Sequence, residues 1–196
     1  MRIISGKYKG HRISPPKNLP VRPTTDMSKE SLFNILNNRF DFDGLKVLDL
    51  FSGTGNLSYE FGSRGAASIT AVDADFGCIK FIKKTASEFD FNISAVKGDV
   101  YKFLEGHKAS YDIIVADPPY HSPQKEFEQV VEFVFENGML SEDGMMIIEH
   151  SRHTTLDHMM NFSFKKKYGG SIFSFFEFDR DEDEESVERN DDIEED

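Results

Sequence analysis

The chain has 196 residues and a formal net charge of −12, with 38% hydrophobic and 30% charged residues. This length suits one domain with a substantial core and a small appendage. The single cysteine, Cys78, excludes an internal disulfide and suits a reducing compartment. No secretory signal begins the chain and no apolar run is long enough to span a bilayer, so we expect a soluble, cytoplasmic protein without a membrane partner.

The charge is distributed unevenly along the chain. Residues 179–196 hold 12 acids and two arginines, whereas residues 1–26 hold six basic residues and one acid. A basic arm of this kind can contact a nucleic-acid backbone or can simply be a solvated surface strand, and charge alone leaves both interpretations open. The basic residues of the arm are Arg2, Lys7, Lys9, Arg12, Lys17 and Arg22.

The N-terminal region predicts a small hairpin, a connector and a helix. Residues 1–14 alternate loosely around glycines, which predicts two short strands joined by a turn. Residues 15–23 are rich in proline and predict an extended connector, because a residue before proline avoids the helical region. Thr25 or Asp26 can then cap a helix. Its apolar positions are Leu32, Phe33, Ile35 and Leu36.

From residue 46 onward, short apolar segments alternate with segments of helical pattern. The predicted strands are 47–51, 68–72, 93–96, 111–116 and 144–150, and the predicted helices are 57–63, 76–89, 100–104 and 127–135. This alternation predicts a doubly wound α/β fold with a mostly parallel sheet. Two further strands, 162–168 and 171–178, surround a two-glycine turn and predict a C-terminal antiparallel hairpin, which gives seven strands in all.

These patterns divide the chain into three parts. Residues 1–24 are the basic hairpin arm with its connector, and residues 25–178 are the α/β domain. Residues 179–196 form an acidic tail with only two apolar side chains, Val187 and Ile193. Such a tail cannot bury enough apolar surface to offset its ordering entropy, so we expect it to be disordered.

The segment 49–55 is the first candidate binding site. It joins a strand to a helix and has the pattern Asp49-x-Phe51-x-Gly53-x-Gly55. The two glycines accept positive φ and allow a ligand close to the main chain, and the helix N-terminus offers free N–H groups. The Asp49 carboxylate would repel a pyrophosphate but would suit an ammonium group, which favours S-adenosylmethionine over NAD. Alternatively, Asp49 only accepts hydrogen bonds from amides of the turn.

Acidic residues also follow the next two predicted strands. Asp73 can accept both hydroxyls of a ribose, although it could instead be an ordinary helix cap. Asp99, with the Val100 backbone beside it, can accept the amino group of an adenine ring. Because the carboxyl ends of parallel strands meet at one edge of the sheet, these three acids predict a shared cofactor site.

The motif Asp117-Pro118-Pro119-Tyr120 ends the fourth strand of the alternating pattern. Its two prolines stiffen the loop and remove two backbone donors. The Asp117 carboxylate and the Pro118 carbonyl then form an acceptor-rich turn that suits an amino group, and Tyr120 offers a flat surface on which a base can stack. The motif therefore predicts a site that receives the exocyclic amino group of a base.

The glycine turn and the 117–120 motif, taken with the N-terminal segments 1–10, 22–26 and 30–34, resemble the RsmD family over about residues 1–178. The resemblance implies a Rossmann-like class I methyltransferase fold. It also implies an S-adenosylmethionine-dependent enzyme that methylates the N2 amino group of a guanine in small-subunit (16S) ribosomal RNA. We expect a monomer that uses no metal and meets its RNA within a small-subunit particle.

The resemblance also implies a role for each candidate residue. Cofactor contacts are implied for Asp49, Phe51, Gly53, Gly55, Asp73, Asp99, Val100, Arg22 and Thr24. The target guanine would be held by Asp117, Pro118, Pro119 and Tyr120, and the RNA by Arg2, Lys7, Lys9, Arg12 and Arg22.

Three features depart from the family pattern. Asp73 stands where the family often has Glu, Tyr120 stands where Phe is also common, and the acidic tail is not part of the pattern.

Two alternative functions stay open. An adenine-N6 methyltransferase of DNA or RNA would use the same 117–120 turn. A non-catalytic RNA-binding protein of ribosome assembly would keep the fold without the reaction.

Overall fold

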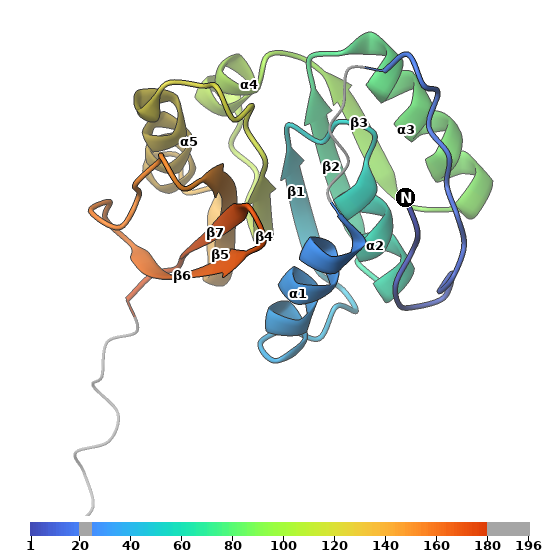
Figure 1. The fold of residues 1–196 in the computed structure, drawn as a ribbon, viewed down its shortest axis with the longest axis horizontal. Coiled ribbons are helices and arrows are strands. Elements are labelled where there is room, and N and C mark those ends of the chain that lie inside the picture. The colour runs from blue at the N-terminus through green and yellow to red at the C-terminus, as the bar shows by residue number, and fades with distance from the viewer. Residues whose placement is uncertain (20–24, 180–196) are drawn as a thin grey trace, which may run out of the picture.

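The computed structural model describes residues 1–19 and 25–179 of the chain. The described residues form one mixed sheet with helices on both faces (Figure 1). The strands are β1 (Lys46–Leu50), β2 (Ser68–Asp73), β3 (Ile93–Lys97), β4 (Tyr111–Ala116), β5 (Leu140–Ser151), β6 (Phe162–Tyr168) and β7 (Ser171–Phe176). The helices are α1 (Asp26–Asn37), α2 (Asn56–Arg64), α3 (Phe76–Phe89), α4 (Val100–Gly106) and α5 (Gln124–Glu136).

The sheet has seven strands in the order β3-β2-β1-β4-β5-β7-β6 among the described residues. β1 to β5 run parallel to one another, whereas β7 pairs antiparallel with both β5 and β6. The chain runs outward from β1 to β3 and then returns to the other side of β1, so the order reverses between β1 and β4. Such a reversal opens a crevice at the carboxyl ends of the strands, where open α/β sheets bind their ligands.

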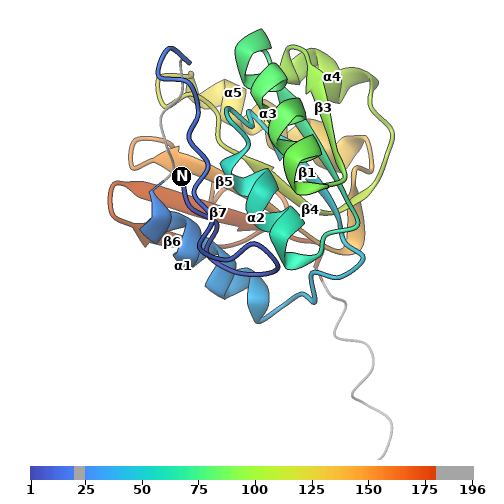
Figure 2. The ribbon, with the colours of Figure 1, turned by 90° about the vertical axis from the view of Figure 1, so that its right-hand side faces the viewer.

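Helices α1, α2 and α3 cover one face of the sheet, and α4 and α5 cover the other (Figures 1 and 2). The alternation of side chains along β1 accounts for the two layers. Val47 packs with α1 and α2, whereas Leu48 and Leu50 pack with α4 and α5. The strands are therefore apolar on both faces, as expected for a sheet with helices on each side. The predicted doubly wound, mostly parallel fold is confirmed.

The N-terminal arm, residues 1–19, lies along α2 and α3 (Figure 2, dark blue). Its predicted hairpin is short: one antiparallel bridge joins Arg2 and Arg12, and backbone hydrogen bonds connect residues 1–3 with residues 10–13. Ile3 and Ile13 are buried against residues of α2 and α3. The arm therefore gains most of its order from packing on the domain, because a short isolated hairpin is marginal in water.

Most element boundaries differ from the sequence predictions by one to four residues. β5 begins at Leu140 rather than at Gly144, because Leu140 pairs with Tyr111 of β4 and so draws a polar stretch into the strand. β7 ends at Phe176, two residues before the predicted end. The predicted disorder of residues 179–196 concerns, apart from Asp179, residues outside the described part of the chain. No described helix is long and apolar enough to span a membrane.

Candidate active site

A cavity of about 730 Å³ opens at the carboxyl ends of the parallel strands, where the order of strands reverses. Segments after four successive strands line it, together with the ends of β5 and β7 and part of the arm. The segments after the strands are 51–54, 73–75, 99–100 and 117–121. A cavity of this volume accommodates a ligand of nucleoside-cofactor size.

Carboxylates dominate the charge of this cavity. The described lining includes five carboxylates and no lysine or arginine. An acidic wall repels phosphate groups and attracts cations. The five carboxylates belong to Asp73, Asp75, Asp99, Asp117 and Glu149.

The loop between β1 and α2 takes an unusual backbone path. Phe51 has φ 58°, an uncommon value for a residue with a side chain, and Gly53 and Gly55 have φ 51° and 83°. A Cβ on Gly55 would lie 2.9 Å from the Tyr59 ring, so any larger residue would displace that side chain. The loop therefore lies tightly over α2 and exposes Phe51 and Gly53 to the cavity, whereas Gly55 is not part of the lining.

Asp49 is buried beneath this loop and is not part of the cavity lining. Its Oδ2 accepts hydrogen bonds from the Ser58 N–H (3.1 Å) and the Ser58 hydroxyl (2.5 Å). Burial raises the pKa of Asp49 to about 7, and the two bonds from Ser58 only partly oppose this effect. Asp49 therefore accepts a hydrogen bond from a backbone amide, which was one of the two interpretations of the sequence. Its contact with a ligand ammonium stays a prediction.

Asp73 ends β2 and joins two loops of the cavity. Its Oδ2 accepts a hydrogen bond from the Gly53 N–H, and its Oδ1 accepts one from the Asp75 N–H, both at 2.8 Å. Burial raises its pKa, although these backbone bonds favour the ionised form. A carboxylate can accept about four hydrogen bonds, so Asp73 retains acceptor capacity for ligand hydroxyls.

Asp99 and Val100 lie at the N-terminus of α4. The Asp99 side chain accepts a hydrogen bond from the Lys102 N–H (3.0 Å) and caps the helix, while remaining exposed at the cavity. Asp75, not Asp73, caps α3 by accepting from the Cys78 N–H at 2.8 Å. The helix-cap alternative considered for Asp73 is therefore wrong.

The 117–120 loop closes the cavity on the β4 side. The Asp117 N–H donates to the Leu50 carbonyl at 3.3 Å, which ties the loop to β1. The Ser122 N–H donates to the Pro119 carbonyl at 2.9 Å, whereas no described residue donates to the Pro118 carbonyl. The role of the Asp117 carboxylate and the Pro118 carbonyl as acceptors for an amino group stays a prediction.

Tyr120 is held by two side chains that the sequence did not assign to the site. Its hydroxyl donates to Glu149 Oε1 at 2.9 Å and lies 2.6 Å from Ser171 Oγ. Because the single phenolic proton goes to the carboxylate, Ser171 must donate to the phenolic oxygen. Burial is the main cause that raises the pKa of Tyr120 to about 12. Tyr120 is therefore a fixed neutral donor at neutral pH.

Glu149 and Ser171 come from β5 and β7, which are remote in sequence from the 117–120 loop. Glu149 is one of the few acids with 7% exposure or less, and it lies at the end of an apolar run in which a charge is costly. That isolated acid after Ile147 and Ile148 was the only sequence signal for its role. The sequence around Ser171 does not indicate a role in the site. Ser171 reaches the site only because β7 pairs with β5.

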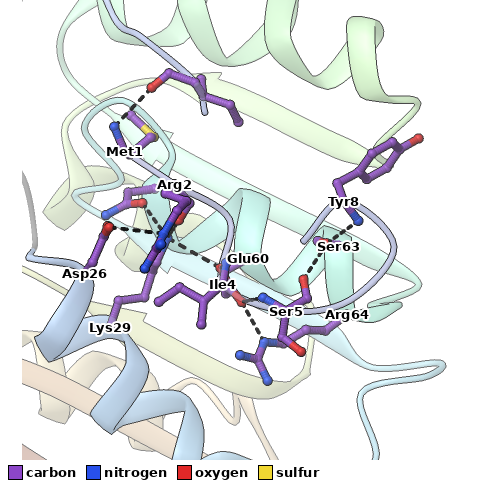
Figure 3. Close-up of polar contacts among 12 residues, drawn as sticks. Met1, Arg2, Ile4, Ser5, Tyr8, Asp26, Lys29, Glu60, Ser63 and Arg64 are labelled. Atoms are coloured by element: carbon purple, nitrogen blue, oxygen red, sulfur yellow. Dashed lines mark hydrogen bonds and ion pairs between the residues drawn. The ribbon is translucent and has the colours of Figure 1, made fainter. Parts of the chain in front are cut away.

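A buried ionic network attaches the arm to α2 (Figure 3). Glu60 has no exposed surface, and its carboxylate accepts from the Ile4 N–H (2.8 Å) and the Ser5 N–H (3.0 Å) of the arm. It also pairs with Arg64 Nε at 2.9 Å and Lys29 Nζ at 3.4 Å. One carboxylate therefore joins the arm, α1 and α2.

Lys29 extends this network to the cavity. Its ammonium is 1% exposed and donates to the Arg2 carbonyl (2.6 Å) and to Asn56 Oδ1 (2.9 Å). Asn56 begins α2 and lines the cavity. Burial lowers the pKa of Lys29, and the charge of Glu60 opposes that effect. The arm, the cavity loop and α1 are therefore held in one arrangement.

The predicted RNA-contact residues that the structure describes lie outside the cavity lining. Lys7, Lys9 and Arg12 are exposed on the arm, and Arg2 is exposed with its Nε 3.5 Å from Asp26 Oδ2. The predictions for Arg22 and Thr24 fall outside the described residues. The arm itself reaches the cavity at Met1 and Pro15.

The sheet order and the site at its switch point define a Rossmann-like fold of the class I methyltransferase type. The family described as "Conserved hypothetical protein 95" matches residues 1–177. The chain belongs to this family, which is the RsmD family identified from the sequence motifs.

Relatives with established descriptions agree with this membership. The chain is 33% identical over 150 residues to "Ribosomal RNA small subunit methyltransferase D" of Buchnera aphidicola, covering 76% of this chain and 75% of the relative. It is 30% identical over 150 residues to the Escherichia coli protein of the same description, covering 76% and 74%.

A solved structure supports the fold. It is the 16S rRNA N2 G1207 methyltransferase RsmC of Thermus thermophilus, in complex with AdoMet and guanosine. It matches with a TM-score of 0.64 and 22% identity, over 81% of this chain and 45% of that one.

The raised pKa of Asp49 leads to a prediction about pH. If Asp49 contacts the ligand ammonium, only its ionised form binds well, and at pH 5.5 most of it is protonated. Affinity for S-adenosylmethionine should then rise about tenfold between pH 5.5 and pH 7, a range in which an α-amino group stays charged. Asp49→Asn should bind more weakly and lose this pH dependence. Isothermal titration calorimetry measures both, and a pH-independent affinity of the unmodified protein would reject the contact.

Proposed function

We propose that this protein transfers a methyl group from S-adenosylmethionine to the N2 amino group of a guanine in small-subunit (16S) ribosomal RNA. The observation that carries the proposal is one cavity that joins an acidic cofactor wall to the acceptor-rich 117–120 loop. The RNA substrate is taken from the descriptions of the Buchnera and Escherichia coli relatives, which name small-subunit ribosomal RNA. The guanine N2 position is taken from the description of the Thermus structure.

The residues of the cavity suit S-adenosylmethionine. The cofactor carries an ammonium and a sulfonium but no phosphate. Asp73, Asp75 and Asp99 form an acidic wall that suits it, and the described lining has no lysine or arginine. We assign Asp73 to the ribose hydroxyls, Asp99 and Val100 to the adenine, and the 51–55 loop to the methionine end. When bound, the cofactor supplies a methyl group on an electrophilic sulfur. Arg22 and Thr24 remain proposed contacts at the mouth.

The 117–120 loop would activate the amino group that receives the methyl. The nitrogen of this group is a poor nucleophile because its lone pair is delocalised into the ring. The Asp117 carboxylate and the Pro118 carbonyl can each accept one of its hydrogens, which holds the nitrogen and favours a more tetrahedral geometry. Both interactions strengthen as positive charge develops on the nitrogen. Asp117 or water can take the released proton, and the assigned steps use no metal.

The target base must leave any stack to reach this loop. Tyr120 supplies a flat ring for the extruded base, and its hydroxyl is fixed by Glu149 and Ser171. A preset ring loses little entropy when the base stacks on it. This arrangement supports a flipped or looped guanine as the substrate.

The exposed arm supports an RNA contact outside the cavity. Lys7, Lys9 and Arg12 are exposed and can contact phosphates of an RNA that extends beyond the cavity, with Lys7 lying beside Ser63 at the C-terminal end of α2. The buried network around Glu60 keeps the arm in a fixed place against α2. We further propose a cytoplasmic monomer that acts on the RNA within a small-subunit particle.

Replacing Lys7, Lys9 and Arg12 together by alanine should weaken RNA binding without changing S-adenosylmethionine binding. The slope of log affinity against log salt should fall by about two to three, since each lost phosphate contact removes about one released ion. Filter binding or fluorescence anisotropy across a salt series measures the slope. A matched triple variant of the exposed Lys80, Lys83 and Lys84 on α3 should keep it. Equal effects of the two variants would reject a specific role of the arm.

Methyl uptake tests the proposal and the form of the substrate. The protein is incubated with radiolabelled S-adenosylmethionine and either unmethylated small-subunit RNA or assembled small subunits. We expect incorporation into RNA, and greater incorporation in the assembled particle. No incorporation into either substrate would instead favour the non-catalytic assembly protein.

A further inference from the structure

Glu149 is a buried carboxylate that the proposed reaction does not use. It follows Ile147 and Ile148 in β5, is 7% exposed, and lines the same cavity as the 117–120 loop. Its Oε1 accepts the Tyr120 hydroxyl, and Oε2 has no hydrogen-bond partner among the described residues. A charge in this position is costly unless something pairs with it. The cavity side of Glu149 therefore suits a ligand that donates a hydrogen bond.

The strand register brings Glu149 next to Asp117. Ala116 of β4 pairs with Ile148 of β5, and Asp117 and Glu149 are the next residues of the two parallel strands. Both carboxylates act on the same phenol, since each helps to raise the pKa of Tyr120. Two acceptors from neighbouring strands therefore face one part of the cavity, with the Tyr120 ring beside them.

A guanine matches two adjacent acceptors. On its Watson–Crick edge, the N2 amino group and the neighbouring N1–H both donate hydrogen bonds. We propose that Glu149 accepts the guanine N1–H while Asp117 and Pro118 hold the N2 amino group, so that Glu149 determines specificity for guanine. The inference rests on the proposed function and names the residue that selects its substrate.

The same carboxylate would reject adenine. Adenine also has an amino group, but its neighbouring N1 is an acceptor that would face a second acceptor at Glu149. A site built to pair with a donor discriminates strongly against a ligand that lacks it. Glutamine at this position could donate to an N1 acceptor through its NH₂ group or accept an N1–H through its carbonyl oxygen. Glu149→Gln should therefore weaken the preference for guanine over a base with an acceptor at N1.

The test uses 2-aminopurine, which keeps the 2-amino group but has an acceptor at N1. Small-subunit RNA is prepared by ligation with guanine or 2-aminopurine at the methylated position, and is offered naked and in reconstituted particles. With the unmodified protein, we expect guanine to be methylated at least about 100-fold faster than 2-aminopurine. With Glu149→Gln, this ratio should fall at least about tenfold. The loss of the 6-oxygen in 2-aminopurine affects both proteins and therefore cancels in the comparison.

Tyr120→Phe separates base recognition from the positioning of Tyr120. It removes the hydroxyl that binds Glu149 but keeps the carboxylate and the ring, so it should lower both rates and keep the guanine preference. If Tyr120→Phe loses the preference as Glu149→Gln does, Glu149 acts only through Tyr120. An unchanged ratio in a folded Glu149→Gln would overturn the inference while leaving the guanine methylation intact. No guanine methylation by the unmodified protein would overturn the proposed function as well.

Discussion

Replacing Asp117 by alanine is expected to lower the rate of methyl transfer by at least about 10²–10³-fold, the loss typical of one preorganised electrostatic group at a reacting centre. Asp117 follows β4, on the base side of the cavity, whereas the residues assigned to the cofactor lie at or after the ends of β1, β2 and β3. Affinity for S-adenosylmethionine should therefore change little. Single-turnover methyl transfer and isothermal titration calorimetry measure the two quantities on the same preparation.

Two further variants test whether the loss of activity is specific to the Asp117 carboxylate. Asp117→Asn keeps one oxygen acceptor but loses the charge, so its rate should lie between those of the unmodified protein and Asp117→Ala. Asp143→Ala removes an exposed carboxylate near the opposite end of the sheet and should have unchanged activity. If Asp117→Ala retains nearly full turnover, Asp117 does not act on the amino group.

Replacing Glu60 by alanine is expected to destabilise the protein by about 3–5 kcal/mol, the range for breaking one side of a buried ion pair. The variant would leave Lys29 buried without its carboxylate and would leave the Ile4 and Ser5 amides without their acceptor. Arg64 would also lose its carboxylate partner, although its hydrogen bond to Asn37 Oδ1 would remain (Figure 3). Urea unfolding measures the change, and hydrogen exchange should show lower protection of the arm.

Glu88→Ala is the matched control for this prediction. Glu88 is also a helical glutamate in an ion pair four residues from its partner, but it pairs with Lys84 at 3.5 Å on the exposed side of α3. Such exposed pairs contribute little, so the free energy of unfolding should change by no more than about 0.5 kcal/mol. Equal effects of Glu60→Ala and Glu88→Ala would show that the buried network does not hold the arm.

The order of elements could be predicted from the sequence because local patterns decide it. The alternation of apolar runs with helical segments gave α3 and β4 with their observed bounds. The acids after successive strands indicated one edge of the sheet, since parallel strands all end there. The loop at 117–120 was also recognisable, because its prolines and tyrosine are adjacent in the chain.

The remaining features depend on contacts between distant segments. Glu60 binds Ile4 and Ser5, which lie more than 50 residues away, and the sequence around Glu60 resembles an ordinary helix. Glu149 reaches Tyr120 only because β5 lies beside β4. Asp49 was expected to face the ligand, but its side-chain direction depends on the fold of the loop above it, and it binds Ser58.

Mass spectrometry of the methylated nucleoside tests the central claim most directly. Unmethylated small-subunit RNA or particles are incubated with the protein and S-adenosylmethionine, and the RNA is then digested to nucleosides. We predict N2-methylguanosine as the product, and its absence when Asp117→Ala replaces the unmodified protein. N6-methyladenosine as the product, or no methylated nucleoside at all, would contradict the account.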